Sequence, residues 1–374
     1  AFASLGDLEI HTEPHPETRK PAVSTVVVDG EPMTPTDRFW LSLYCRYGFN
    51  KSFFKYFGHE EVLRRIAQVE PRDRVRLCIE RSERTGNPRL LATSNPAKPV
   101  LHPDALRETL HRYGGENVRY ANGVIESTHV PRVGGHPFEI GGDTLCNRFL
   151  LSAPIDGYGM PSIYLSLLRQ VCANGMVGYS PTFRSTLTLG RGEDNAIYSI
   201  VRVLDGFASD EGYAALRQRL EAATQSWASV YEAQTLHRLL VKLLARHNIR
   251  RQEGTGGTLL SGAEGETPDE RVMNGFHRMT GEVPQLYGLA NLDGLSVKRQ
   301  RTLPVRCRVY DLLNFASELA THHATGDGPR MAQGWIGTLI SHEYDLEHSC
   351  DSFDEFQDFF LERKPGGETA TATQ

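Results

Sequence analysis

Residues 213–247 of this chain read YAALRQRLEAATQSWASVYEAQTLHRLLVKLLARH and contain neither glycine nor proline. Apolar residues recur at intervals of three and four along the segment, as at Leu216, Leu220 and Ala223. This spacing places them on one face of an α-helix, so the segment predicts one long helix or two abutting helices. A further helical section follows, and its clearest element is expected at Tyr310–His323.

Signals for short β-strands dominate the chain before this segment. Residues 74–80 (RVRLCIE) alternate charged and apolar positions, and a Gly-Asn-Pro turn separates them from a hairpin partner at 90–93. Dipeptides that favour tight turns, including Asn122-Gly123 and Gly141-Gly142, separate several later strands. These later strands are expected at 118–120, 123–130, 138–140, 147–153, 162–168, 185–189 and 196–204.

The sequence therefore predicts an α+β fold, in which a β-rich N-terminal half with an antiparallel or mixed sheet is followed by a helical C-terminal half. Proline-rich residues 1–36 are expected to form an extended N-terminal arm. Residues 37–205 would form the sheet-rich region, which opens with helices rich in aromatic residues, and residues 206–350 the helical region packed on it. Residues 351–374 read as an acidic C-terminal segment with a disordered tail.

Composition indicates a globular protein of 374 residues with a formal net charge of −5. The apolar runs are far shorter than the ~20 residues of a membrane-spanning helix, so no membrane association is expected. The opening residues contain Asp7 and Glu9, which a signal peptide would lack, and a cytoplasmic location is expected. The six cysteines form no CxxC pair, which excludes a cysteine-rich zinc module and favours reduced thiols.

The common cofactor motifs are also missing. The chain has no GxxxxGK[ST], GxSxG or GxGxxG motif, so no cofactor is expected. His342 and His348 flank several acidic residues, but two histidines six positions apart do not share a helix face. We therefore expect no metal site.

The strongest local charge feature is the segment KRQRTLPVRCR, residues 298–308, which we call the basic strip. It contains five basic residues, and no acidic residue lies between Asp293 and Asp311. Such a strip could hold phosphates of a nucleic acid, although a solvated loop followed by a helix would look similar. The candidate nucleic-acid contacts are Lys298, Arg299, Arg301, Arg306 and Arg308, with Arg169 and Arg184 from the sheet-rich region.

The run FLLSAPIDGYGMPSIYLSLLRQVCANGM, residues 149–176, resembles the centre of a phage- and plasmid-related family known as domain of unknown function 932. The resemblance extends over roughly residues 36–345 and implies a setting in replication, recombination or maintenance of mobile elements. It transfers no catalytic residue. The positions that match the family signature are Asp156, Gly157, Arg169, Cys172, Asn174 and Gly175.

Three hypotheses of function remain open from the sequence. The first is a nucleic-acid-associated accessory protein of mobile-element origin that acts on single strands of DNA or RNA. The second is an enzyme of unrecognised class centred on Asp156, Arg169 and Cys172 with Asn174, although the sequence around Cys172 favours a buried position before an Asn-Gly turn. The third is a self-assembling structural protein, in which the long helical segment and an open sheet edge would form a homo-oligomer.

Overall fold

A computed structural model describes residues 1–14, 21–81, 86–169, 174–177, 183–249, 265–292, 294–326 and 328–342, together with Leu260 and Gly262. The chain divides into two compact units. Unit 1 contains residues 1–129, 151–163 and 186–207. Unit 2 contains residues 130–150, 164–185 and those from 208 onward. The acidic segment expected at 351–374 lies outside the described residues.

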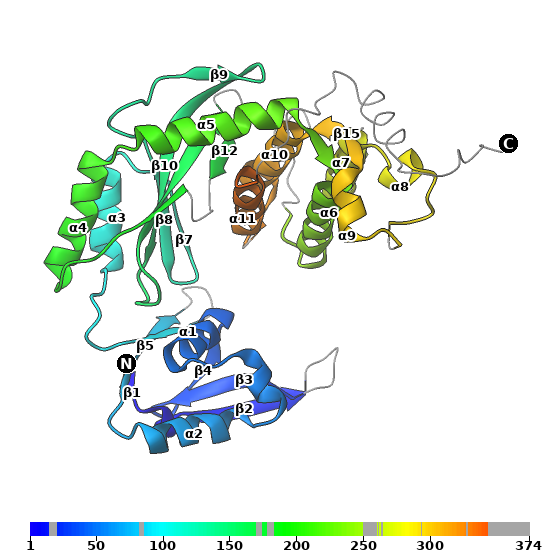
Figure 1. Ribbon diagram of the computed structural model, residues 1–374. Coiled ribbons are helices and arrows are strands. Elements are labelled where there is room, and N and C mark those ends of the chain that lie inside the picture. The colour runs from blue at the N-terminus through cyan, green and yellow to red at the C-terminus, as the bar shows by residue number, and fades with distance from the viewer. Residues whose placement is uncertain are drawn as a thin grey trace. The chain divides into compact units, whose positions relative to one another are not determined.

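Unit 1 opens with a six-stranded sheet in the order β1-β5-β6-β4-β3-β2. All its pairings are antiparallel except that of β4 with β6, so the sheet is mixed. The apolar faces of two helices, α1 and α2, share one core with it (Figure 1). The elements are β1 Phe2–Ala3, η1 Leu5–Asp7, β2 Glu9–Pro14, β3 Pro21–Val28, β4 Glu31–Pro35, α1 Asp37–Tyr47, η2 Lys51–Lys55, α2 His59–Val69, β5 Val75–Arg81 and β6 Pro88–Ser94.

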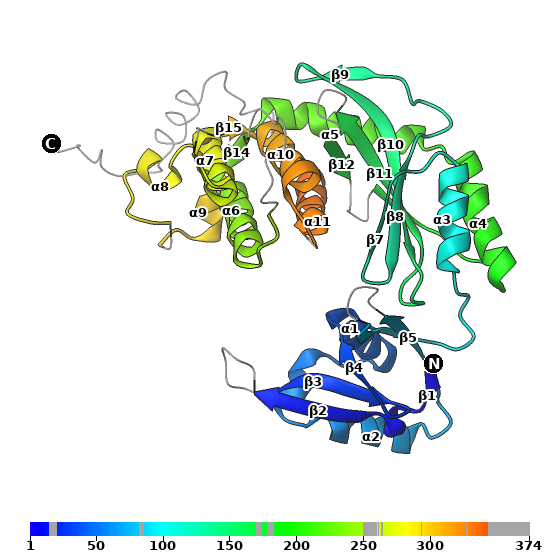
Figure 2. The same ribbon diagram turned by 180° about the vertical axis from the view of Figure 1, so that it is seen from behind.

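A second, seven-stranded sheet follows in the order β12-β11-β10-β8-β7, with β13 paired to β11 and β9 to β10. Two helices of unit 1, α3 and α4, pack side by side next to it (Figure 2). The long strand β10 and strand β11 contribute residues to both units. The elements are α3 Pro103–Arg112, β7 Glu116–Ala121, β8 Val124–His129, β9 Phe138–Ile140, β10 Asp143–Pro154, β11 Ser162–Arg169, β12 Asn174–Val177, β13 Arg184–Thr186 and α4 Glu193–Gly206.

The rest of unit 2 is mainly helical and contains one two-stranded sheet, in which β14 pairs with β15. Helix α10 continues into a π-helical turn, η4, and packs against α11. The elements are α5 Asp210–Gln225, β14 Trp227–Ser229, α6 Val230–Ala245, α7 Pro268–Thr280, α8 Val283–Leu286, α9 Val297–Thr302, β15 Pro304–Arg308, α10 Val309–Glu318, η4 Leu319–His323 and α11 Gly328–Ile340. The fold is thus α+β, as the sequence predicts. Within the described residues, no helix combines the length and apolarity that a membrane crossing requires.

The structure differs from the expected extended arm in residues 1–36. These residues contribute strands β1 to β4, and Val26, Val28 and Met33 are buried in the core of unit 1. A two-residue turn at Asp29-Gly30 joins β3 to β4, and both residues have positive φ. The turn closes a hairpin, which places the alternate apolar residues of β3 and β4 on the core.

The strand expected at 196–204 is instead part of helix α4. Ala196 and Ile200 are fully buried, and their spacing of four residues puts them on one face of α4, a helix that packs against α3. The segment 213–247 forms two helices, α5 and α6, separated by strand β14. Ser229 begins α6 with a capping box that includes Glu232, which explains why the two helices do not merge.

Candidate functional site

The basic strip occupies helix α9 and strand β15 of unit 2. The side chain of Ser296 accepts a hydrogen bond from the backbone N–H of Arg299, which starts α9. Strand β15 alternates, with Val305 and Cys307 buried and Arg306 exposed between them. Because the core takes every second residue of the strand, the basic residues of β15 point away from it.

Two arginines of the strip stack on aromatic rings. The guanidinium carbon of Arg301 lies 4.7 Å from the centre of the Tyr231 ring, at the start of α6. That of Arg308 lies 3.8 Å from the centre of the Trp227 ring, which stands opposite it in the β14–β15 pair. Both rings are half-buried, so each keeps part of its surface open to solvent. Arginine over an aromatic face is a favourable cation–π arrangement that also holds the guanidinium in place.

Three basic residues of the strip are not neutralised by a carboxylate in the part of the chain that the structure describes. Among the described residues, Lys298, Arg299 and Arg301 form no ion pair with a carboxylate, and Lys298 and Arg301 are exposed. Glu232 accepts the backbone N–H of Ser229 in the α6 capping box, and burial raises its pKa while the Arg301 charge acts in the opposite direction. The local field is therefore suited to an anion.

We call the surface made by these side chains the arginine–aromatic surface. It comes from four elements, α6, α9, β14 and β15, that pack against one another. The cluster of basic residues in the sequence indicated the cations of this surface. It did not indicate the two aromatic residues, because these lie about 70 positions upstream. Its members are Trp227, Tyr231, Lys298, Arg301, Arg306 and Arg308.

The two other candidate contacts behave differently from each other. Arg184 is exposed on β13, and its guanidinium carbon lies 5.7 Å from the centre of the Tyr164 ring. Arg169 instead forms a 2.6 Å ion pair with Asp143, in which both side chains are largely buried. The Tyr310 hydroxyl also donates to Asp143, at 3.0 Å. Arg169 is therefore committed to the interior of unit 2, and we do not include it in the arginine–aromatic surface.

The first part of the family signature is a buried turn in unit 1. Arg38 binds the Asp156 carboxylate through Nε and Nη2, and the side chain of Asp156 is fully buried. The backbone N–H of Tyr158 donates to the same carboxylate at 2.9 Å. Gly157 has a φ of +77°, and a Cβ there would lie 2.6 Å from the Ser94 hydroxyl. This position therefore needs glycine.

The structure does not gather the signature into one catalytic group among the described residues. Asp156 and Arg169 belong to different units, and each forms its own ion pair. Asn174 and Gly175 lie in strand β12, paired with β11, rather than in the expected turn. Cys172 lies outside the described residues. Nor do the described residues include a group of three or more histidine, cysteine or acidic side chains that could hold a metal ion.

In comparisons with known proteins, no family model matches this chain, and no curated protein or solved structure is significantly similar to it. The resemblance to the domain of unknown function 932 family therefore stays a prediction. So does the alternative of a self-assembling protein.

Proposed function

We propose that this protein binds single-stranded nucleic acid, DNA or RNA, through the arginine–aromatic surface of unit 2. The observation that carries the proposal is the pair of stacks Arg301 on Tyr231 and Arg308 on Trp227, beside the exposed cations Lys298 and Arg306. Cations attract the phosphates of the backbone, whereas aromatic faces accept unpaired bases. A surface that offers both suits a single strand, because a duplex keeps its base faces stacked inside.

The resemblance to a phage- and plasmid-related family supports a setting for this activity. We place it in the cytoplasm, as an accessory function in the replication or recombination of a mobile element. Binding without sequence preference is expected, because the surface offers charge and ring faces rather than a fixed set of base-edge contacts.

The test compares the intact chain with a variant that carries Lys298→Ala, Arg301→Ala and Arg306→Ala. Fluorescence anisotropy with labelled 20-nucleotide poly-dT and poly-U measures affinity at several salt concentrations. Removing one cation that binds a phosphate lowers the salt slope by about 0.7 on single strands, so the slope is expected to fall by about 2. Affinity at low salt is expected to drop at least tenfold.

A matched control removes three exposed arginines of unit 1, in the variant Arg64→Ala, Arg72→Ala and Arg202→Ala. It changes the net charge equally and is expected to retain most of the binding. Equal losses in the two triple variants would mean that only net charge matters and would refute a defined surface. Absence of binding to either probe at low salt would also refute the proposal.

A further inference from the structure

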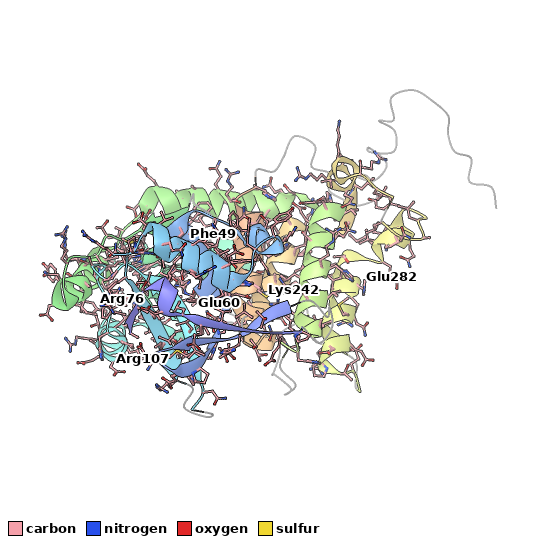
Figure 3. All side chains as sticks on the ribbon, turned by 90° about the horizontal axis from the view of Figure 1, so that it is seen from below. Phe49, Glu60, Arg76, Arg107, Lys242 and Glu282 are labelled. Atoms are coloured by element: carbon pink, nitrogen blue, oxygen red, sulfur yellow. The ribbon has the colours of Figure 1, made fainter. Side chains whose placement is uncertain are left out.

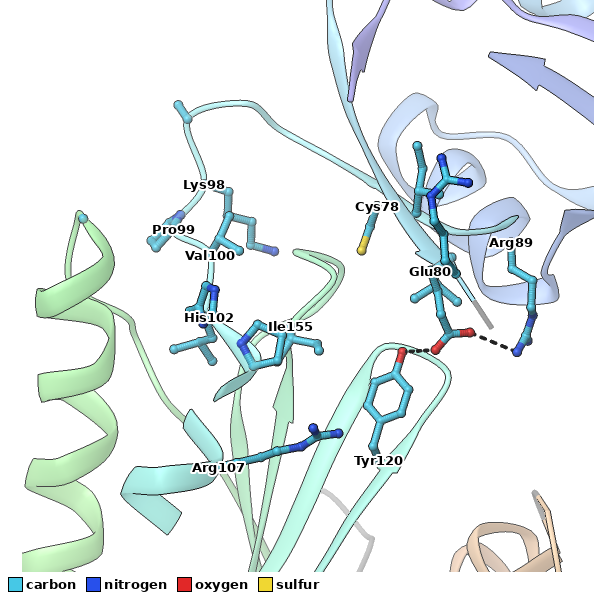
Figure 4. A pocket seen from close by; sticks show the side chains of 17 residues that line it. Cys78, Glu80, Arg89, Lys98, Pro99, Val100, His102, Arg107, Tyr120 and Ile155 are labelled. Carbon is cyan, nitrogen blue, oxygen red and sulfur yellow. Dashed lines mark hydrogen bonds and ion pairs between the residues drawn. The ribbon is translucent and has the colours of Figure 1, made fainter. Parts of the chain in front are cut away.

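A pocket of about 1060 Å³ lies within unit 1, and none of its lining residues belongs to the arginine–aromatic surface. Its volume is at the upper end of the range for small-molecule sites. The walls come from β5, β6, the segment leading into α3, and Tyr120 of β7 (Figure 4). Segments far apart in the sequence therefore form the pocket, and no sequence motif predicted it.

The pocket lining carries more cationic than anionic side chains, although one of the cations, Arg81, is paired with Glu31 outside the lining. Among the described residues that line it, Glu80 supplies the one carboxylate, and this group is already engaged. The Tyr120 hydroxyl donates to one oxygen of Glu80, and Arg89 forms a 3.0 Å ion pair with the other. The cationic side chains of the lining are Arg81, Arg89, Lys98 and Arg107.

Two of these cations are available to a ligand. The Lys98 ammonium donates to the backbone oxygen of Gly159 at 2.8 Å, and the Arg107 guanidinium carbon lies 6.0 Å from the centre of the Tyr120 ring. Within the described part of the chain, neither Lys98 nor Arg107 forms an ion pair with a carboxylate. Lys98 and Arg107 extend from one side of the pocket toward Glu80 on the other (Figure 4). Arg107 is also labelled among the side chains of the whole molecule in Figure 3. An anion placed between them would gain two charge-assisted contacts.

The pocket also has an apolar wall, which restricts the class of anion. Leu91, Val100, Leu101 and Ile155 line it, and the half-exposed ring of Tyr120 offers a flat face. Inorganic phosphate alone would leave this wall in contact with water. A ligand that carries both phosphate and a planar, largely apolar ring system would use both halves of the pocket.

The thiol in the pocket does not alter this charge balance. Burial, with a contribution from the Asp156 charge, raises the pKa of Cys78 to about 11. The thiol is therefore neutral near pH 7 and is a poor nucleophile. Its place in the lining indicates binding rather than covalent chemistry.

We infer that this pocket binds a nucleoside diphosphate or a close relative, with its phosphates on Lys98 and Arg107 and its base against Tyr120 and the apolar wall. The inference concerns a different unit from the proposed single-strand site and shares no residue with it. Either one can therefore fail without the other.

Isothermal titration calorimetry of the intact chain with ADP, UDP and pyrophosphate tests this inference. We expect both nucleotides to bind, and to bind more tightly than pyrophosphate. Arg107→Ala and Lys98→Ala are each expected to weaken nucleotide binding at least tenfold. The matched control is Arg112→Ala on the same helix α3, which removes the same charge from an exposed arginine outside the pocket and is expected to change affinity less than twofold.

A second variant distinguishes ligand binding from a structural role by the direction in which nucleotide affinity changes. Glu80→Gln removes the lining carboxylate and frees Arg89, so it is expected to strengthen nucleotide binding at least threefold. A merely structural role for this network would weaken binding in Glu80→Gln as well as in Arg107→Ala. No heat of binding with either nucleotide at millimolar concentration would overturn the inference, as would equal affinities of Arg107→Ala and the intact chain.

The pH dependence of binding offers an additional measurement. Burial, with the neighbouring charges of Arg76 and Arg38, lowers the pKa of Lys98, while Asp156 acts in the opposite direction. Lys98 therefore loses its charge at a lower pH than an exposed lysine, and nucleotide affinity is expected to fall as pH rises through that range. Lys98→Arg should abolish this alkaline loss, because arginine stays charged. An unchanged alkaline profile in Lys98→Arg would contradict the assigned role.

Discussion

Replacing Asp156 with alanine is expected to destabilise unit 1 by about 3 to 5 kcal/mol, the range for breaking one side of a buried ion pair. The Asp156 side chain is fully buried, and its partner Arg38 is 18% exposed. Without the carboxylate, the guanidinium of Arg38 keeps its hydrogen bond to the backbone oxygen of Tyr158, at 2.6 Å, and its contact with the Tyr158 ring, at 4.9 Å, but it loses its ion pair. The backbone N–H of Tyr158 loses its acceptor as well. The first loss leaves a largely buried cation without its counter-charge, and the second leaves a backbone donor without its acceptor, which is the costly case.

Urea denaturation, monitored by hydrogen exchange in peptides of α1 and β6, measures the stability of unit 1 specifically. The matched control is Glu31→Ala, which breaks an ion pair with Arg81 in the same unit whose side chains are 39% and 60% exposed, respectively. An exposed pair contributes at most about 1 kcal/mol, so Glu31→Ala should change stability little. The double variant Arg38→Met with Asp156→Ala should recover part of the loss, because it removes the orphaned charge. A cost of Asp156→Ala no larger than that of Glu31→Ala would contradict the structural role of this pair.

Local patterns were sufficient to predict much of the sheet. Residues 74–80 alternate in the way that β5 requires, and the following turn leads back into the antiparallel partner β6. Asn122 and Gly123 both adopt positive φ between β7 and β8, as the dipeptide predicts. These features depend on a few neighbouring residues, which is why the sequence alone reveals them.

Two regions could not be predicted in the same way. The signal for the β3–β4 hairpin was present at Asp29-Gly30, but the surrounding prolines suggested an arm. In α4, a run of β-branched and aromatic residues favours a strand by local propensity. Burial of Ala196 and Ile200 in a helix that packs against α3 overrides that preference, and such tertiary packing cannot be predicted from the local pattern.

The candidate sites show the same division between local and long-range information. The cations of the basic strip are adjacent in sequence and were predicted, whereas Trp227 and Tyr231 come from distant elements. The ion pair of Arg169 with Asp143 could not be predicted from the sequence either, because the two residues meet only when β10 and β11 are part of the sheet. A cluster of charged residues can thus be recognised in the sequence, whereas the residues that form ion pairs with them cannot.

The ion pair of Arg169 with Asp143 leads to the last prediction, in which the two partners are expected to have unequal effects. Asp143 also accepts hydrogen bonds from the Tyr310 hydroxyl at 3.0 Å and from the Asn314 amide at 3.3 Å. Burial and the Asp143 charge raise the pKa of Tyr310, so its hydroxyl remains a donor across the accessible pH range. Asp143 therefore keeps two donors when Arg169 is removed.

Arg169 has no equivalent support, because its Nε is buried without a hydrogen-bond partner among the described residues. Asp143→Ala is therefore expected to destabilise unit 2 by about 3 to 5 kcal/mol, as an uncompensated buried charge does. Arg169→Met is expected to cost only about 1 to 2 kcal/mol, since the remaining carboxylate stays hydrogen-bonded and the methionine fills the space of the alkyl chain. Hydrogen exchange in peptides of α10 and β11, with urea denaturation, measures both. If Arg169→Met proved the more damaging change, Arg169 would have to serve a contact beyond Asp143, and the enzyme hypothesis built on this arginine would regain support.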